Sequence, residues 1–173
     1  STGSAVKAPA NTTAPPPTRK REASVLENTP EGLIRSQQFE ENRGSLPWPV
    51  DRGIVTLHYG TNKISGLWTK ALEIPSDGLT LEVAIGAPVK AVFEGEVSSV
   101  FSMGNIQVIT IKHGKYFTTY SNLQSVSVSK GTRVAAGQVI GKAAVNDDGV
   151  GEVSFQIDTE RGSQNPEIWL RRR

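Results

Sequence analysis

The chain has 173 residues, a nearly balanced charge of 19 Lys and Arg against 17 Asp and Glu, and no cysteine. This length accommodates one domain of ordinary size with a tail, and the lack of cysteine excludes disulfides and thiolate metal sites. Basic residues cluster only at 19–21 and 171–173, too few for a nucleic-acid interface, and no apolar run reaches the roughly 20 residues of a membrane span.

Residues 1–28 are rich in Pro, Thr and Ala and contain almost no large apolar side chain before Val25. Such a segment cannot bury enough surface to offset the entropy lost on ordering, so we expect a disordered linker. The chain shows no signal peptide and does not begin with Met, which favours a mature product or a trimmed chain.

Residues 29–44 are expected to form a short helix. Thr29, Pro30 and Glu31 supply a capping hydroxyl, a proline for the first helical position and an acid for the first turn, and Gly44 is a stop signal. The apolar stripe of this segment is poor, and a helix of ~14 residues is marginal in water by itself. We therefore expect it either to pack on the domain that follows or to be the end of a longer helix.

Residues 45–173 are predicted to form an all-β domain. Runs of β-branched and aromatic residues are separated by glycine-containing turns, and residues 106–113 and 116–120 form a predicted hairpin around Gly114. Because no amphipathic helix interrupts these short strands, we expect a small antiparallel β-sandwich or barrel. Trp169 and Leu170 are expected to plug one end of its core.

A series of motifs runs in order from Leu46 to Leu170: LPWPV, the His58-Tyr59-Gly60 turn, GAPVKAVFEGEV, IKHGKYFTTYSNL, KGTRVAAGQVIG, EVSFQI and NPEIWL. In order and spacing, this series resembles the LytM (lysostaphin-type) metallopeptidase domain, the fold of many peptidoglycan endopeptidases. Two of the motifs also resemble the hairpins of biotinyl and lipoyl carrier domains. Those carriers need a modifiable Lys at the central turn, and residues 102–105 contain none, so we reject that reading.

Active LytM-type enzymes hold zinc through three patterns: His-x-Gly-x-Asp, Tyr-x-His-Leu and His-x-His-Phe. The resemblance places Ser76 and Thr80 in the first pattern, Asn122 at the histidine of the second, and Glu152 and Ser154 at the two histidines of the third. Hydrolytic zinc needs three protein ligands and an open position for water, which these hydroxyls do not replace. The resemblance therefore implies a degenerate, non-catalytic domain without a metal or other cofactor.

A different cation site is a weaker hypothesis. His58 and His113 are the only imidazoles, and Asp77 with Glu152 supplies carboxylates near the former site. For His113, at the end of a hairpin, the simpler interpretation is a hydrogen-bonded structural histidine.

Degenerate LytM domains resemble the EnvC-like activators of murein hydrolases. The resemblance implies a periplasmic protein of cell division whose groove binds a helix of a zinc-dependent N-acetylmuramoyl-L-alanine amidase and activates that enzyme. In this group the helix before the domain restrains the groove, so residues 29–44 are a candidate restraint. An upstream coiled coil binds FtsX of the FtsEX complex; this chain lacks that coiled coil, so FtsEX is implied only if the chain is a fragment.

The expected groove has a floor of small polar groups and aromatic or basic walls, which suits an amphipathic helix. The candidate wall residues are Tyr59, Lys63, Trp68, Lys70, Tyr116 and Tyr120. The alternative for each is that it covers the core, and for Tyr120 both readings stay open. Two alternatives to activation are a module that binds peptidoglycan without activating anything and a scaffold protein of the division machinery.

Overall fold

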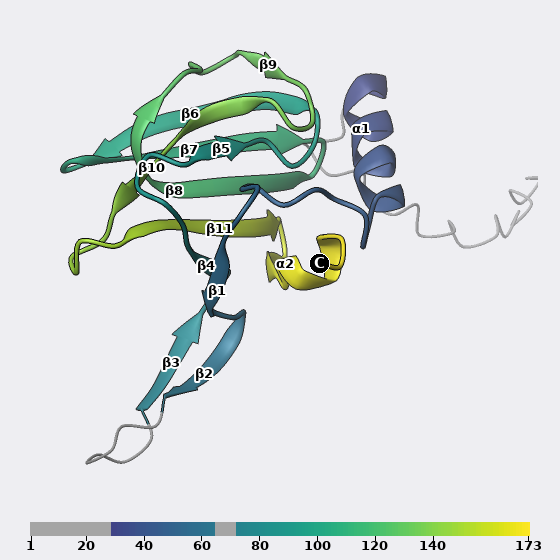
Figure 1. Ribbon diagram of the computed structural model, residues 1–173. Helices are drawn as coiled ribbons and strands as arrows, with labels where there is room; N and C mark the ends of the chain where they lie inside the picture. The colour runs from purple at the N-terminus through teal and green to yellow at the C-terminus, as the bar shows by residue number, and fades with distance from the viewer. Residues whose placement is uncertain (1–28, 65–71) are drawn as a thin grey trace, which may run out of the picture.

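The computed structural model describes residues 29–64 and 72–173 (Figure 1). Within these residues the chain forms one twelve-residue helix, twelve strands and a short closing helix. In chain order the elements are α1 (Pro30–Glu41), β1 (Ile54–Leu57), β2 (Gly60–Ile64), β3 (Leu72–Ser76), β4 (Leu79–Glu82), β5 (Pro88–Lys90), β6 (Gly95–Met103), β7 (Ile106–His113), β8 (Tyr116–Val126), β9 (Arg133–Val134), β10 (Val139–Val145), β11 (Gly151–Thr159), β12 (Gly162–Gln164) and α2 (Pro166–Trp169). Neither described helix is long and apolar enough to cross a bilayer.

The strands confirm the predicted all-β, antiparallel domain. Ten of the described strands form one sheet in the order β1-β4-β11-β10-β8-β7-β6-β9, with β12 paired to β11 and β5 paired to β10. Strand β8 changes partner along its length, pairing with β11 over residues 117–121 and with β10 over residues 123–126. This change of partner curls the sheet around a single core.

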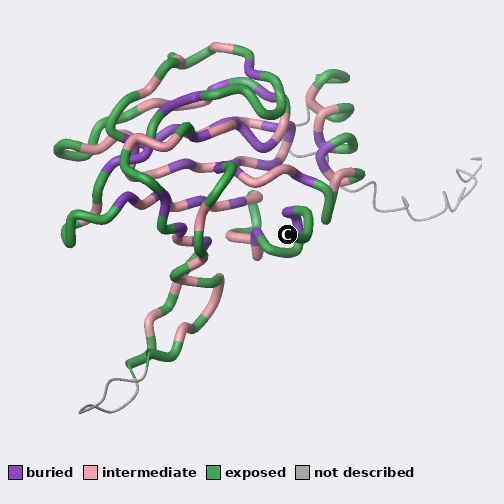
Figure 2. Tube along the Cα trace, viewed as in Figure 1, coloured by how far each residue is buried: buried purple, intermediate pink, exposed green. Residues whose placement is uncertain are grey.

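Strands β2 and β3 form a separate hairpin that projects from the sheet (Figure 1). Figure 2 shows that none of its described residues is buried, in contrast to the central strands. The hairpin is therefore held through its base, where Asn62 donates hydrogen bonds to the carbonyls of His58 (2.7 Å) and Ile74 (3.2 Å).

The core lies between the curled strands and is built from alternating side chains. Tyr120, Ile109 and Phe155 come from three paired strands and are fully buried. Trp169 and Leu170 close one end, and the backbone of Leu46 forms a bridge with Leu170. The predicted role of this Trp-Leu pair as a plug is therefore confirmed.

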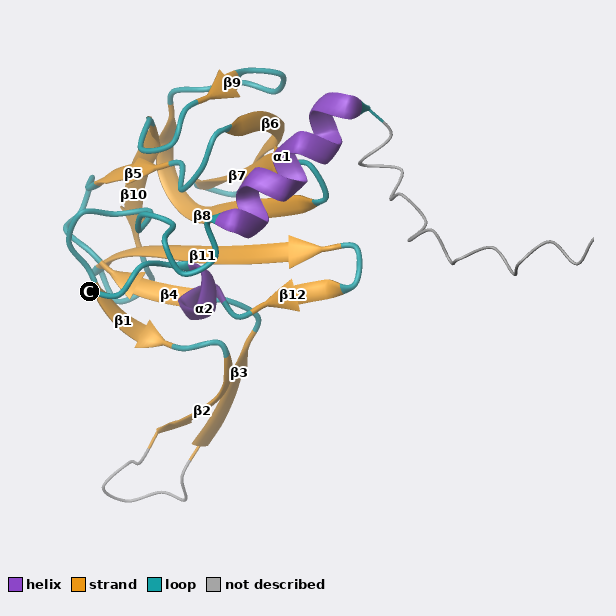
Figure 3. Ribbon diagram, turned by 90° about the vertical axis from the view of Figure 1, so that its right-hand side faces the viewer, coloured by secondary structure: helices purple, strands orange, loops and turns teal. Residues whose placement is uncertain are grey.

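Helix α1 packs on the turn between β7 and β8 (Figure 3). Phe39 is fully buried and its ring centroid lies 4.7 Å from that of Tyr116 and 5.0 Å from those of His113 and Trp169. The Ser36 hydroxyl accepts a hydrogen bond of 2.9 Å from the Lys115 amide. The helix thus gains from the domain the packing that its own sequence pattern lacks.

Candidate functional site

Three of the five positions that the resemblance assigns to a former catalytic site lie together on the outward face of the sheet. Thr80 of β4 is the cross-strand partner of Ser154 of β11, and Ser154 is the partner of Ser121 of β8. Asn122 follows directly. The buried neighbours of these residues along each strand, such as Leu81 and Phe155, point into the core, so the polar side chains face outward. Because side chains alternate between the two faces of each strand, these polar side chains come together on one face of the sheet.

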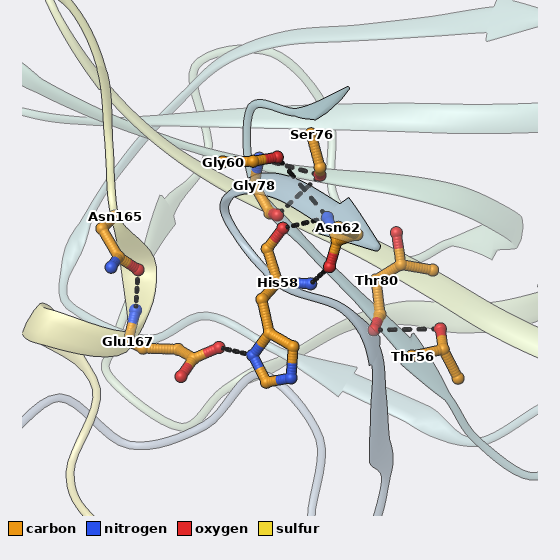
Figure 4. A network of polar contacts seen from close by, with 9 residues as sticks. All are labelled: Thr56, His58, Gly60, Asn62, Ser76, Gly78, Thr80, Asn165 and Glu167. Carbon is orange, nitrogen blue, oxygen red and sulfur yellow. Dashed lines mark hydrogen bonds and ion pairs between the residues drawn. The ribbon is translucent and has the colours of Figure 1, made fainter. Parts of the chain in front are cut away.

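Ser76 reaches this site through a turn that requires glycine. Its hydroxyl donates a hydrogen bond of 2.8 Å to the Gly78 carbonyl (Figure 4). A Cβ on Gly78 would lie 2.3 Å from the Phe155 carbonyl oxygen, so a side chain there would push the turn off β11. The glycine of the SDGLT motif thus lets Ser76 and Thr80 approach the neighbouring strand.

Asn122 has a backbone role in this structure. It is the one non-glycine residue with positive φ (67°) in the described part of the chain, a conformation that Asn tolerates better than most residues. Its side-chain amide donates to the carbonyls of Glu152 (2.8 Å), Ala144 (3.3 Å) and Val145 (3.3 Å). The amide therefore ties β8 to β10 and β11 at the point where β8 changes partner.

The donor set of this site does not fit zinc. Ser76 uses its hydroxyl in the turn, Thr80 and Ser154 offer neutral hydroxyls, and the carboxylate of Glu152 accepts a hydrogen bond from Asn146 (3.2 Å). Within residues 29–64 and 72–173, no group of three or more His, Cys, Asp or Glu side chains is placed to hold a metal ion. Because zinc sites are built from imidazole, thiolate and carboxylate, no catalytic step through a metal follows from these residues.

The alternative cation site is not assembled either. Asp77 lies near Asp158, where its negative charge, added to the effect of burial, raises the pKa of the Asp158 carboxyl. Glu152 lies six residues earlier on β11, about 20 Å away along an extended strand. The two carboxylates proposed from the sequence are thus far apart.

The two histidines have structural partners. His58 contacts the carboxylate of Glu167 through Nδ1, which ties the β1–β2 turn to α2 (Figure 4). His113 is fully buried, with Nδ1 2.7 Å from the Glu94 carbonyl and Nε2 2.8 Å from the Thr118 hydroxyl. Burial, opposed in part by the hydrogen bond to Glu94, lowers the pKa of His113 to about 4. The prediction of a structural His113 is confirmed.

Two of the predicted groove walls belong to the interior. Tyr120 is fully buried, and its hydroxyl accepts a hydrogen bond of 2.9 Å from the Val92 amide. Tyr116 is buried under α1, and its hydroxyl donates to the Glu40 carboxylate at 2.7 Å. Each side chain points to the inner face of β8, where its hydroxyl finds a partner. The groove expectation is therefore wrong for Tyr116, and for Tyr120 the structure favours the alternative, a core residue.

Tyr59 and Lys63 lie beside and within the β2–β3 hairpin. Tyr59 is half-buried at its base, where its hydroxyl donates to the Ser163 carbonyl (3.2 Å). Lys63 is exposed on β2. Trp68 and Lys70 lie outside the described residues.

Helix α1 does not cover the former catalytic positions. It contacts the start of β8 at Lys115 and Tyr116, whereas Asn122 lies six residues further on, about 20 Å along an extended strand. The expectation that residues 29–44 occupy the groove is therefore wrong for this arrangement, because Phe39 finds an aromatic pocket at the other end of the strand.

Strand β6 carries two apolar residues that were not predicted from the sequence to belong to a site. Phe101 and Met103 are exposed and lie on the same outward face as the former site. Phe101 and Met103 are two residues apart, so in a strand both side chains point to the same face. This spacing was the sequence signal that could have identified them.

Residues 75–166 match the family model of Peptidase family M23, and the chain belongs to this family. Two relatives support the match. An uncharacterized protein of Neisseria meningitidis serogroup B is 32% identical over 81% of this chain, and an uncharacterized protein of Haemophilus influenzae is 32% identical over 59% of it. The matched regions make up 22% and 26% of those proteins, so this chain spans about a quarter of their length or less.

Solved structures share the fold. Helicobacter pylori Csd3 aligns with a TM-score of 0.61 at 18% identity, over 74% of this chain and 35% of that one. The structure of the SpoIIQ–SpoIIIAH pore-forming complex aligns with 0.62 at 23% identity, over 75% and 92%. Lysostaphin from Staphylococcus simulans aligns with 0.57 at 21%, over 75% and 54%. At these identities the likeness concerns the fold alone.

Proposed function

We propose that this domain is a non-catalytic member of its family that activates a peptidoglycan amidase by binding a helix of that enzyme at the former catalytic site. The observation that supports the proposal is the cluster of uncharged hydroxyls, Ser76, Thr80 and Ser154, at the positions where the resemblance expects zinc ligands. Function follows the site and not the fold, so an M23 fold with this donor set favours binding over hydrolysis.

The physical character of the site supports a protein ligand. Thr80, Ser121 and Ser154 are half-buried and uncharged, so they can be covered without the cost of desolvating a charge. The exposed hairpin of β2 and β3 projects beside β4 and can contact a second molecule without disturbing the core. An N-acetylmuramoyl-L-alanine amidase of the periplasm is the partner we propose; FtsEX is a further partner only if the full protein carries the coiled coil of the EnvC-like group.

The test is release of dye-labelled peptidoglycan by an amidase of the same organism, with and without this protein. We expect stimulation in the mixture and no release by this protein alone. A Ser154→Arg variant places a long side chain on the floor of the site and should lower stimulation at least several-fold. The matched control is Ser129→Arg, at an exposed loop position away from the site.

Two results would contradict the proposal. Release of dye by this protein alone would show an enzyme. Absence of stimulation, combined with co-sedimentation of the protein with purified sacculi, would show a wall-binding module instead.

A further inference from the structure

The former catalytic site continues across the sheet into an apolar surface. Ser154 is opposite Ser121, and the register shift between β7 and β8 places Val108 opposite residues 121–122. Val108 is in turn the cross-strand partner of Phe101. Because cross-strand partners point to the same face, one row of side chains runs from Thr80 on β4 to Phe101 on β6.

The far end of this row is exposed and apolar. Phe101 retains 47% and Met103 58% of its accessible surface, and both stand on the outward face of β6 beside Val108 and Ile106. Large apolar side chains grouped on one exposed face commonly mark a contact surface. Methionine and phenylalanine are also well suited to receive the apolar side of a helix.

The near end of the row is acidic. Strands β4, β8 and β11 carry Glu82, Glu152 and Asp158 but no Lys or Arg. Glu82 and Glu152 are cross-strand partners, and among the described residues neither forms an ion pair. Like charges directly opposite each other in a sheet are destabilising, and a cation placed between them relieves that repulsion.

We infer that this face, defined by Thr80, Ser154, Phe101 and Met103 around the buried Val108, binds a basic amphipathic helix. Apolar side chains of the helix would pack on Phe101 and Met103, and its Lys or Arg residues would meet Glu82 and Glu152. Five strands with four spacings of about 4.8 Å span about 19 Å, the length of roughly 13 helical residues. The inference rests on the proposed function and specifies the chemistry of the amidase segment.

The first experiment measures binding of two fluorescent 14-residue model helices by anisotropy, one built from Leu and Lys and one from Leu and Glu. We expect the protein to bind the Lys helix at least tenfold more tightly, and the preference to shrink as salt rises. Phe101→Ser should weaken binding at least fivefold, while Ile34→Ser, at an exposed apolar position on α1, should not. Glu82→Gln should reduce the preference for the Lys helix, while Glu41→Gln, at an exposed position on α1, should leave it intact.

The second experiment repeats the amidase assay with the same four variants, with far-ultraviolet circular dichroism to confirm that each is folded. Loss of stimulation with Phe101→Ser and Glu82→Gln, but not with their controls, supports the inference. Stimulation equal in all variants overturns the inference and leaves the proposed function standing. If the unmodified protein stimulates no amidase, the proposed function fails. The peptide measurement still tests whether this face binds a basic helix. Equal binding of both model helices overturns it.

Discussion

Three side chains form a buried polar line inside this domain: His113, Thr118 and Tyr120. The His113 ring bonds to Thr118 at 2.8 Å, and the Thr118 hydroxyl lies 3.1 Å from that of Tyr120. Within the described residues, no buried side-chain nitrogen or oxygen lacks a hydrogen-bond partner. A network with every member satisfied tolerates burial, but it fixes His113 in its neutral form.

Stability should therefore depend on the protonation of His113. Its pKa in the folded protein is about 4, below the usual 6.5. Between these values the unfolded chain binds more protons, so the free energy of unfolding falls as the pH is lowered from 6.5 to 4, by a total of about 3 kcal/mol. Above about pH 7 the contribution of His113 is fully present.

Urea denaturation at a series of pH values measures this effect. A His113→Gln variant serves as the control, because it keeps every carboxylate of the parent but cannot titrate at this position. We expect its free energy of unfolding to vary less over the same pH range. Equal pH dependence in the two proteins would show that His113 contributes nothing.

Helix α1 is anchored to the domain mainly through one fully buried apolar side chain, Phe39. Its apolar pattern is weak, and Leu33 and Ile34 remain exposed, yet Phe39 is fully buried among three aromatic rings and the His113 ring. Gly114 is required at this contact, because a Cβ there would lie 2.1 Å from the Ser36 hydroxyl. The tight turn between β7 and β8 is thus part of the docking site of the helix.

Phe39→Ala should lower the free energy of unfolding by about 3–5 kcal/mol, the usual cost of emptying a buried aromatic position. Leu33→Ala on the exposed side of the same helix should change it by less than about 1 kcal/mol. Chemical denaturation of both variants, monitored by tryptophan fluorescence, measures the difference, since Trp169 contacts Phe39. Similar values for the two variants would mean that the helix is not anchored through Phe39.

The whole domain has the fold of its family, and Ser76, Thr80 and Ser154 stand at the positions where the resemblance places zinc ligands. Gly78 still lets the SDGLT turn approach β11, and Thr80 still pairs with Ser154. The fold depends on strand register and backbone contacts, whereas metal affinity depends on the side chains that act as ligands. Metal affinity can therefore be lost while the fold is retained.

Restoring the donors should therefore restore metal binding. We expect the triple variant Ser76→His, Thr80→Asp, Ser154→His to bind about one equivalent of zinc, because three ligands of the family's type would converge. The unmodified protein should bind no stoichiometric zinc at micromolar concentration. Isothermal titration calorimetry measures both, and the double variant Ser76→His, Thr80→Asp is a control that should bind more weakly. Stoichiometric zinc in the unmodified protein would contradict our account of the site.

Much of the architecture followed from the sequence alone. Period-two alternation and glycine turns predicted the antiparallel strands, and Thr29 with Pro30 predicted the start of α1. The assignment of Ser76, Thr80, Asn122, Glu152 and Ser154 to a former catalytic site stays a prediction from the motif spacing. These features are local, because strand alternation, helix capping and turn chemistry depend on residues a few positions apart.

Only the tertiary structure decided which face of each strand is covered and where α1 docks. Tyr116 and Tyr120 look suited to a binding groove, yet both point inward, while Ser121 and Asn122 lie at the bulge where β8 changes partner. Phe101 and Met103 became part of the candidate surface only through their pairing with β7. Facing and docking depend on contacts between residues far apart in the chain, which a local pattern does not contain.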